Sequence, residues 1–318
     1  MSDQHKDPNK DPNIPDTTGH SWDGIEEYDN PLPRWWLWIF YATIVWGVIY
    51  TIAYPAWPLV NRATAGVLGF STRAQVADQI AEAEMANAEL NAQLASADLR
   101  TLTEDETLHS YAVNMGAAVY RAQCSQCHGS GAAGAVGFPN LIDDAWIWGG
   151  RIDEIAWTVA HGIRNEDSPD ARWSQMPAFG ADDLLSRDEI NQVVQHVLAI
   201  SGQDHDADLA AAGEEVFLDN CASCHGNEGM GSLMATREFQ AEDPDGEYFP
   251  DDERTGAPNL TDAIWVFGGD EAAIYQSVYY SRFGVMPAWL DEFRQPGLTQ
   301  AEVNAVAAYV HQLGGGEE

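Results

Sequence analysis

Basic side chains are scarce in this chain of 318 residues. Lysine and arginine number 15 against 50 aspartate and glutamate residues, which gives a net charge of −35 at neutral pH. This composition argues against a nucleic-acid partner, because binding to phosphates needs clustered basic residues. The charge suits a protein partner with a basic docking face, since complementary fields speed association, but an acidic surface that only confers solubility fits it equally well.

Cysteine is equally sparse, and all four residues lie in two short stretches, CSQCHGSG and CASCHGNE. Each stretch contains Cys-x-x-Cys-His, the sequence to which haem c is attached. In that arrangement two thiols one helical turn apart bond to the haem vinyl groups, and the adjacent histidine binds the iron. The sequence therefore predicts two covalent haem c groups, one on Cys124 and Cys127 and one on Cys221 and Cys224.

Three other uses of paired cysteines explain less of the pattern. A zinc site needs two Cys-x-x-Cys halves about 15–20 residues apart, far closer than Cys124 and Cys221. A thioredoxin-like redox pair needs a βαβ setting, and no such pattern of strands is visible. Disulfide bonds are compatible with the spacing, but they would not require His128 and His225 directly after the second cysteine of each pair.

One long stretch, WWLWIFYATIVWGVIYTIAY at 35–54, carries no charged side chain. Twenty helical residues span about 30 Å, the thickness of a bilayer's hydrocarbon core, and the Trp and Tyr residues at its ends resemble interfacial belts. A buried core helix would rarely be apolar on every face. A cleaved signal peptide would not follow such a long acidic segment. We therefore predict an anchor helix over 35–56 that crosses a lipid bilayer once.

The segments on either side of the anchor look like a tail and a connector. Residues 1–33 are rich in Pro, Asn, Asp and Lys and poor in large apolar side chains, so the tail (1–34) is expected to be disordered. The connector at 57–108 contains a stretch, 72–100, with Ala, Glu and Gln and roughly helical apolar spacing. We expect a stiff helix there, whereas a coiled-coil partner surface explains the stretch less well.

Beyond residue 109 the chain repeats itself. GAAVYRAQCSQCHGSGAAG aligns without gaps on GEEVFLDNCASCHGNEGMG, and three later landmarks recur in the same order: Pro-Asn-Leu, Met-Pro-Ala and a final helix. Each final helix starts with a Ser/Thr-x-x-Glu capping box, at Ser186 and Thr299, and continues with apolar residues at helical spacing. These landmarks predict two copies of one all-α domain, 109–202 and 205–314.

A six-coordinate haem needs a second iron ligand opposite the histidine. Met176 and Met286 occupy equivalent places in the two repeats, and the proline after each one keeps its thioether on a loop. We expect Met176 above the first haem and Met286 above the second, with His128 and His225 as the opposite ligands. His161 is the main rival at the first haem, where it would lower the potential that methionine raises.

Two further features stay open. Arg164 and Arg282 fall near each other when the repeats are aligned, and they could contact haem propionates or form surface salt bridges. The second repeat also carries an acidic insert at 236–256. It could be a solvated loop or a docking surface for a basic cytochrome c.

The combination of one anchor, two haem domains and the stretch HGIRNEDSPDARWSQMPAFG resembles the dihaem subunit (FixP or CcoP) of cbb3-type cytochrome c oxidases, from residue 20 onward. The resemblance implies an all-α fold with one transmembrane helix and two tandem class I cytochrome c domains. It also implies electron transfer from a cytochrome c donor to a monohaem subunit and a catalytic haem–copper subunit, which reduces oxygen and pumps protons. The chain would then have no catalytic residues and be no enzyme on its own.

Other functions compatible with two haems are a free membrane-tethered electron shuttle, a peroxidase and a haem sensor. A peroxidase needs an open position on one iron, whereas each repeat supplies a methionine, and no output module for a sensor is visible. Thioether attachment takes place outside the cytoplasm, so we expect the haem domains in the periplasm of a bacterial inner membrane and residues 1–34 in the cytoplasm. The charges beside the span are too few to decide the orientation.

Overall fold

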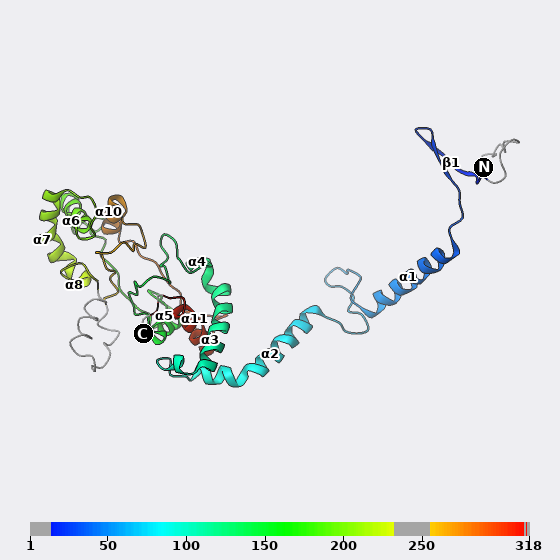
Figure 1. The fold of residues 1–318 in the computed structure, drawn as a ribbon, viewed down its shortest axis with the longest axis horizontal. Coiled ribbons are helices and arrows are strands. Elements are labelled where there is room, and N and C mark those ends of the chain that lie inside the picture. The colour runs from blue at the N-terminus through cyan, green and yellow to red at the C-terminus, as the bar shows by residue number, and fades with distance from the viewer. Residues whose placement is uncertain (1–13, 232–254, 315, 317–318) are drawn as a thin grey trace. The chain divides into compact units, whose positions relative to one another are not determined.

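The structure, a computed structural model, describes residues 14–231, 255–314 and 316. The chain divides into two compact units, residues 1–86 and 87–318 (Figure 1). The acidic insert at 236–256 lies almost entirely outside the described residues.

A β-hairpin occupies part of the tail that was expected to be disordered. Strand β1 (Thr17–Trp22) pairs antiparallel with β2 (Ile25–Tyr28). The two residues between them, Asp23 and Gly24, have positive φ values of 50° and 83°, as in the type I′ turn that Asp-Gly favours. The prediction of disorder was therefore wrong for these residues, because a local turn signal outweighed the polar composition.

Helix α1 (Arg34–Ala53) coincides with the charge-free stretch, and none of its side chains is buried. It is long and apolar enough to cross a membrane. After the helix the chain turns back, and the amides of Val67 and Leu68 donate to the carbonyls of Ile52 and Ala53 at 2.9 and 3.1 Å. These bonds satisfy two of the carbonyls that the end of a helix leaves without partners.

In the part of the second unit that the structure describes, the regular elements are helical. Helix α2 (Thr72–Ala95) runs across the boundary between the units. The hydroxyls of Ser186 and Thr299 accept hydrogen bonds from backbone amides three residues later, so both predicted capping boxes are confirmed. The elements after α2 are η1 (Leu102–Glu104), α3 (Glu106–Val119), η2 (Tyr120–Cys124), α4 (Ser125–His128), α5 (Ile152–His161), α6 (Arg187–Ile200), α7 (Ala207–Asn220), α8 (Ala222–His225), α10 (Glu271–Tyr280) and α11 (Gln300–His311).

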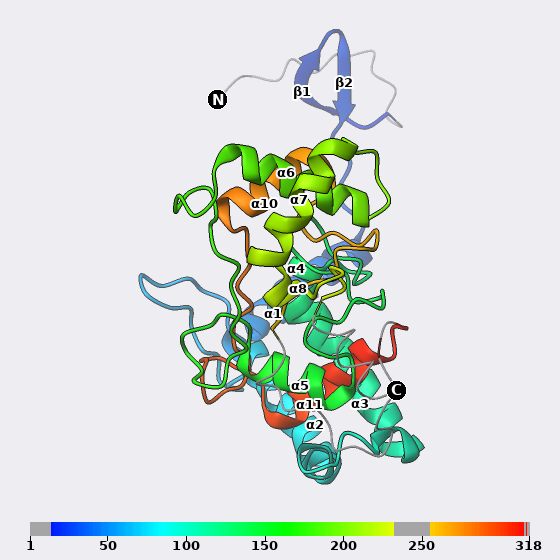
Figure 2. The same ribbon diagram turned by 90° about the vertical axis from the view of Figure 1, so that its left-hand side faces the viewer.

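These helices form two bundles that do not follow the sequence repeats. Helix α11 packs against α3 and α5, and we call this group the first bundle. Helix α6 packs against α7 and α10, and we call this group the second bundle (Figures 1 and 2). The final helix of each repeat therefore lies in the bundle of the other repeat. In this respect the structure differs from the self-contained domains predicted at 109–202 and 205–314.

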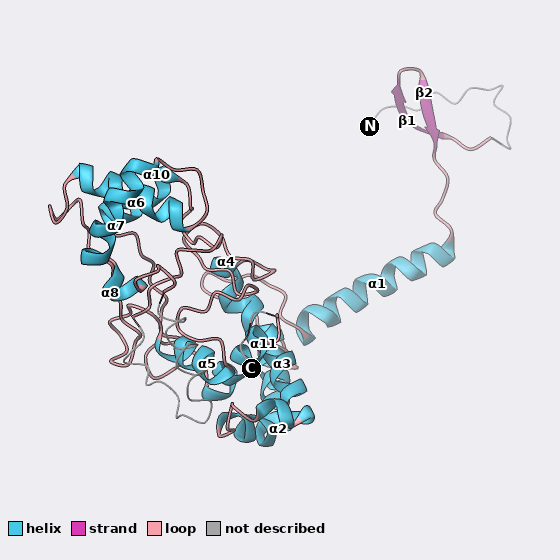
Figure 3. Ribbon diagram, turned by 60° about the vertical axis from the view of Figure 1, so that its left-hand side comes forward, coloured by secondary structure: helices cyan, strands magenta, loops and turns pink. Residues whose placement is uncertain are grey.

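Each bundle has its own apolar core, and the exchanged helix supplies a large part of it. Figure 3 shows the helices of both bundles in cyan. In the first bundle, Val303 and Val306 of α11 are completely buried against α3 and α5. In the second bundle, Ile190 and Val193 of α6 are buried with Phe217 of α7. Because burial of apolar side chains is the main stabilising term in folding, neither repeat can complete its core without the other.

Candidate functional site: two haem-binding segments

Both Cys-x-x-Cys-His motifs lie on short helical turns at the end of a longer helix. The first motif follows α3 through the π-helical turn η2 and ends with α4, and the second follows α7 and ends with α8. None of the four cysteines, all within the described residues, forms a disulfide bond. Cys124 and Cys221 are partly buried against the cores of the first and second bundles, whereas Cys127 and Cys224 are exposed. The helical turn thus places one thiol of each pair against a core and the other at the surface.

The histidine of each motif is fixed by a carbonyl of a nearby loop. The Nδ1 atom of His128 lies 3.1 Å from the carbonyl oxygen of Pro139, and that of His225 lies 3.0 Å from the carbonyl oxygen of Pro258. A carbonyl can only accept, so each Nδ1 carries the proton and each Nε2 is left with a lone pair. Burial lowers the pKa of both imidazoles, although the carbonyl contacts oppose it. Burial thus favours the neutral form of both histidines, which is the form that binds a metal.

Burial also raises the pKa of one cysteine in each motif, which disfavours the thiolate form. It raises the pKa of Cys124 and of Cys221 to about 11, and the second thiol of each pair adds to the effect. A zinc or redox site needs thiolates and therefore a lowered pKa. A haem held through thioether bonds needs no thiolate, so the residues present fit that group better.

Met286 packs against the first bundle, as Cys124 of the first motif does. Its backbone pairs with Ile163, which directly follows α5 and Gly162, through two hydrogen bonds of 3.0 Å. Its side chain packs against the core of the first bundle, which also contains Cys124. Gly162 permits this contact, because a Cβ there would lie 2.4 Å from the carbonyl oxygen of Met286.

Met176 lies with the second motif instead. Its side chain packs against the core of the second bundle, as does Cys221, and its carbonyl accepts a hydrogen bond from the hydroxyl of Ser281. The sequence repeats predicted Met176 at the first haem and Met286 at the second, whereas in the structure each methionine packs against the bundle that carries the motif of the other repeat. The physical reason is the helix exchange, because the loops that carry the methionines cross between bundles on their way to α6 and α11.

His161, the rival ligand from the sequence, is engaged by its neighbours. Its Nδ1 lies 2.9 Å from the hydroxyl of Ser168, and its ring centroid lies 4.3 Å from that of Trp157 and 5.4 Å from that of Phe293. Burial is the main cause that lowers its pKa. The surroundings of His161 are those of a packed side chain.

The guanidinium groups of Arg164 and Arg282 bond to protein oxygens in this structure. Arg164 donates to the carbonyls of Ser174 and Gly284, and Arg282 donates to the hydroxyl of Ser277 and to two backbone carbonyls. Burial lowers the pKa of Arg164, but an arginine stays charged in proteins. The expected propionate contacts stay predictions.

Family models match three successive parts of the chain. A model described as the N-terminal domain of cytochrome oxidase-cbb3, FixP, matches residues 15–61. One described as cytochrome c oxidase, cbb3-type, subunit III, matches residues 112–197, and one described as cytochrome c matches residues 210–314. The predicted anchor and both haem motifs fall within these matches.

Curated relatives match almost the whole chain. A cbb3-type cytochrome c oxidase subunit CcoP of Cereibacter sphaeroides is 55% identical over 96% of this chain and 97% of the relative. The chain belongs to the CcoP/FixP family. A CcoP of Rhodobacter capsulatus is 48% identical over 95% of this chain and 96% of the relative, and a FixP of Sinorhizobium medicae is 43% identical over the full length of both. Membership of the CcoP/FixP family, together with the two cytochrome c matches, implies that the chain binds haem c.

One residue near the first motif of this CcoP/FixP member was missed in the sequence. The hydroxyl of Tyr120 donates to the carbonyl of Gly129 at 2.9 Å, directly after the motif, and only 1% of the side chain is exposed. Burial, with smaller contributions from Cys124 and Tyr309, raises the pKa of Tyr120 to about 12. The alignment of the two repeats could have singled out Tyr120, because the aligned residue in the second repeat is Phe217, which lacks a hydroxyl.

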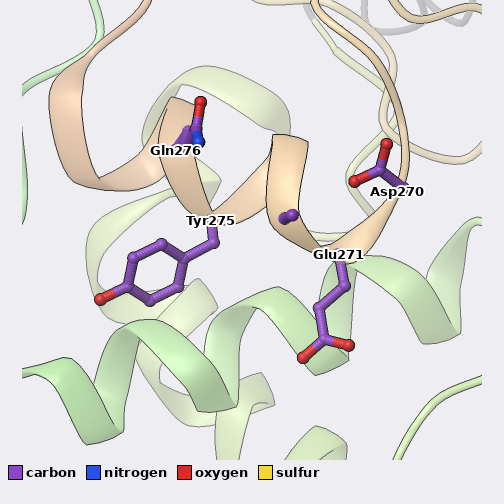
Figure 4. Close-up of a pocket in the computed structure, with 5 residues that line it drawn as sticks. Asp270, Glu271, Tyr275 and Gln276 are labelled. Atoms are coloured by element: carbon purple, nitrogen blue, oxygen red, sulfur yellow. The ribbon is translucent and has the colours of Figure 1, made fainter.

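A surface pocket on α10 does not belong to either haem segment. Glu271 in this pocket accepts a hydrogen bond of 3.1 Å from Gln195 on α6. None of its lining residues is a cysteine, histidine or methionine, so it offers no iron ligand. The lining residues are Asp270, Glu271, Ala272, Tyr275 and Gln276 (Figure 4).

Proposed function

We propose that the chain is the electron-transfer subunit of a cbb3-type terminal oxidase and carries two covalently attached haem c groups. Relatives named as CcoP or FixP subunits match it over nearly its whole length. The observation that carries the haem assignment is the pair of histidines, His128 and His225, whose Nδ1 atoms bond to loop carbonyls and leave Nε2 for iron. When bound, haem c supplies a one-electron redox couple.

The first haem site, in this proposal, draws its ligands from both repeats. Cys124 and Cys127 would hold the haem, and His128 and Met286 would be the ligands of its iron. The placement of Cys124 and Met286 against the same core supports this set. The two hydrogen bonds between Ile163 and Met286 support it further, because they fix the methionine loop on the first bundle.

The second haem site is arranged in the same way. Cys221 and Cys224 hold the haem, and His225 and Met176 bind the iron. Met176 and Cys221 pack against the core of the second bundle, which supports this set. Histidine with methionine gives each haem a higher potential than two histidines would, which suits electron transfer between a cytochrome c and an oxidase.

The route that we propose begins at a basic cytochrome c donor and ends outside this chain. The net charge of −35 favours fast encounter with a basic partner. The acceptors are a monohaem cytochrome c subunit and the catalytic haem–copper subunit of the oxidase, so the chain is no enzyme on its own. Helix α1 anchors it in the inner membrane, and the haem-bearing unit lies in the periplasm, where thioether bonds are formed.

Blue-native electrophoresis of solubilised membranes, followed by haem staining, tests this function. We expect the haem-stained chain in a large band that also reduces oxygen with reduced cytochrome c. A small band free of oxidase activity would instead indicate a membrane-tethered shuttle, and hydrogen peroxide reduction by that band would indicate a peroxidase. Denaturing gels of the same sample should retain haem stain at the full-length mass, because thioether bonds survive denaturation.

A further inference from the structure

One arginine contacts both loops that carry the proposed methionine ligands. The Nε of Arg164 donates to the carbonyl of Gly284 at 2.7 Å, and its Nη1 donates to the carbonyl of Ser174 at 2.8 Å. Gly284 lies two residues before Met286, and Ser174 lies two residues before Met176. A single guanidinium thus bonds at the same position of each loop.

The surroundings of Arg164 hold it in this bridging position. Its amide donates to the carbonyl of Arg172 at 2.8 Å, and its φ of 51° lies in the left-handed region that side chains other than glycine rarely adopt. The guanidinium carbon lies 5.7 Å from the ring centroid of Phe283. The planar fork of an arginine can donate in two directions at once, and hydrogen bonds from a charged donor are stronger than neutral ones.

Arg282, which falls near Arg164 when the repeats are aligned, makes no such bridge among the described residues. Its guanidinium donates to the hydroxyl of Ser277 and to the carbonyls of Phe267 and Ala273. All of these acceptors precede it in the second repeat, and none lies in the segment that follows α5 or in the four residues before Met286. The bridge is therefore particular to Arg164 and is no general feature of the repeat.

We infer that Arg164 is a positioning residue shared by the two haem sites, which holds the loops of Met176 and Met286 at the same time. The inference rests on the methionine ligands proposed above. Its consequence is a coupling between the sites, because loss of one side chain loosens both thioethers from their irons. This role differs from a propionate contact, which would act on one haem only.

The test measures how easily imidazole displaces each methionine in the ferric full-length chain. Two backgrounds separate the haems, since Met176→His leaves only Met286 to be displaced and Met286→His leaves only Met176. Arg164→Gln is introduced into both backgrounds, with Arg282→Gln as the matched control. Loss of one charge-assisted hydrogen bond shifts an equilibrium by about tenfold, so we expect imidazole to bind about tenfold more tightly in both backgrounds of Arg164→Gln. Arg282→Gln should tighten imidazole binding in one background at most.

A change in only one background, or in neither, would overturn the inference. Arg164→Lys extends the test, because it keeps the charge but loses the planar two-way fork. A lysine cannot donate to both carbonyls through such a fork, so it should loosen at least one loop, and wild-type imidazole affinity in both backgrounds would overturn the bridge. Arg164→Lys also decides the question if Arg164→Gln does not accumulate with two covalent haems. If the wild-type ferric chain itself lacks the near-infrared sulfur–iron band at both haems, the proposed methionine ligation fails and not the bridge alone.

Discussion

Gly116 on α3 and Ala305 on α11 touch so closely that a Cβ on Gly116 would lie 2.0 Å from the carbonyl oxygen of Ala305. A matching contact joins Gly213 on α7 to the carbonyl oxygen of Gln192 on α6, where the Cβ distance would be 2.1 Å. At both points the helix before a haem motif crosses the final helix of the other repeat. Glycine is required there, because the backbones lie in direct contact.

Gly116→Ala should therefore destabilise the protein. The added methyl group meets backbone and cannot be relieved by a side-chain rotation, and overpacking of this kind costs about 1–3 kcal/mol. Urea unfolding followed by far-ultraviolet circular dichroism measures the change. Gly131→Ala is the control, since a Cβ at Gly131 has no heavy atom within 4 Å. Equal unfolding midpoints for the two variants would contradict the close crossing.

Removal of α11 should damage the first haem site and leave the second intact. Helix α11 packs on α3 and α5, whereas α6, α7 and α10 form their core without it. A chain that stops after Leu298 is compared in two forms, one with Cys124 and Cys127 changed to serine and one with Cys221 and Cys224 changed. The low-spin spectrum should be lost only in the form that keeps the first motif. Loss of the low-spin spectrum in the form that keeps the second motif would mean that α11 packs within its own repeat.

The exchanged methionine pairing predicts which substitution changes which potential. In a chain that keeps only the first motif, Met286→His should lower the haem potential, because imidazole stabilises the ferric state better than a thioether does. We expect a fall on the order of 0.1 V, a fraction of the range of about 0.8 V that axial ligands span. Spectroelectrochemistry gives the value. Met176→His in the same chain is the control. If that variant alone lowers the haem potential, each methionine binds the haem of its own repeat.

His161→Ala should leave both haems low-spin. The imidazole of His161 already contacts Ser168, Trp157 and Phe293, so its removal takes away packing and a hydrogen bond of about 1 kcal/mol. The ferric absorption spectrum and the unfolding midpoint measure the two effects separately. Appearance of a high-spin haem in His161→Ala, with the sulfur–iron band unchanged in Met286→Leu, would make His161 the ligand of the first haem.

Acid should weaken the second bundle at a pH above the range in which carboxylates titrate. His196 of α6 packs its ring 5.0 Å from that of Phe217, and burial lowers its pKa, although Glu214 and the carbonyl of Ala210 oppose this. The folded state then binds fewer protons than the unfolded chain, so stability falls as the pH drops through about 6.5.

The midpoints of urea unfolding at about pH 7.5 and about pH 5.5, which lie above and below the pH at which an unfolded histidine titrates, test this dependence. His196→Gln should show a smaller fall between the two pH values than the wild type. His205→Gln, which changes an exposed histidine, should keep the wild-type fall. A wild-type fall in His196→Gln would place the acid sensitivity elsewhere.

Local signals in the sequence were sufficient for the parts of the site that lie close together along the chain. The Cys-x-x-Cys-His turns, the capping boxes at Ser186 and Thr299 and the anchor helix all depend on neighbouring residues. The helix exchange could not be predicted in this way. Helices α6 and α11 carry similar apolar stripes, so the sequence pattern does not distinguish the core that each one joins, and the choice depends on packing between distant segments.

The exchange also sets an order for folding during synthesis, when the chain emerges from its N-terminus. The second bundle has all its helices once α10 has emerged, at Tyr280, although its haem motif lies nearly 100 residues after that of the first. The first bundle must wait for α11, which ends at His311. The earlier Cys-x-x-Cys-His motif therefore lies on an incomplete bundle until α11 has emerged, whereas the later motif joins a bundle whose helices are almost all in place.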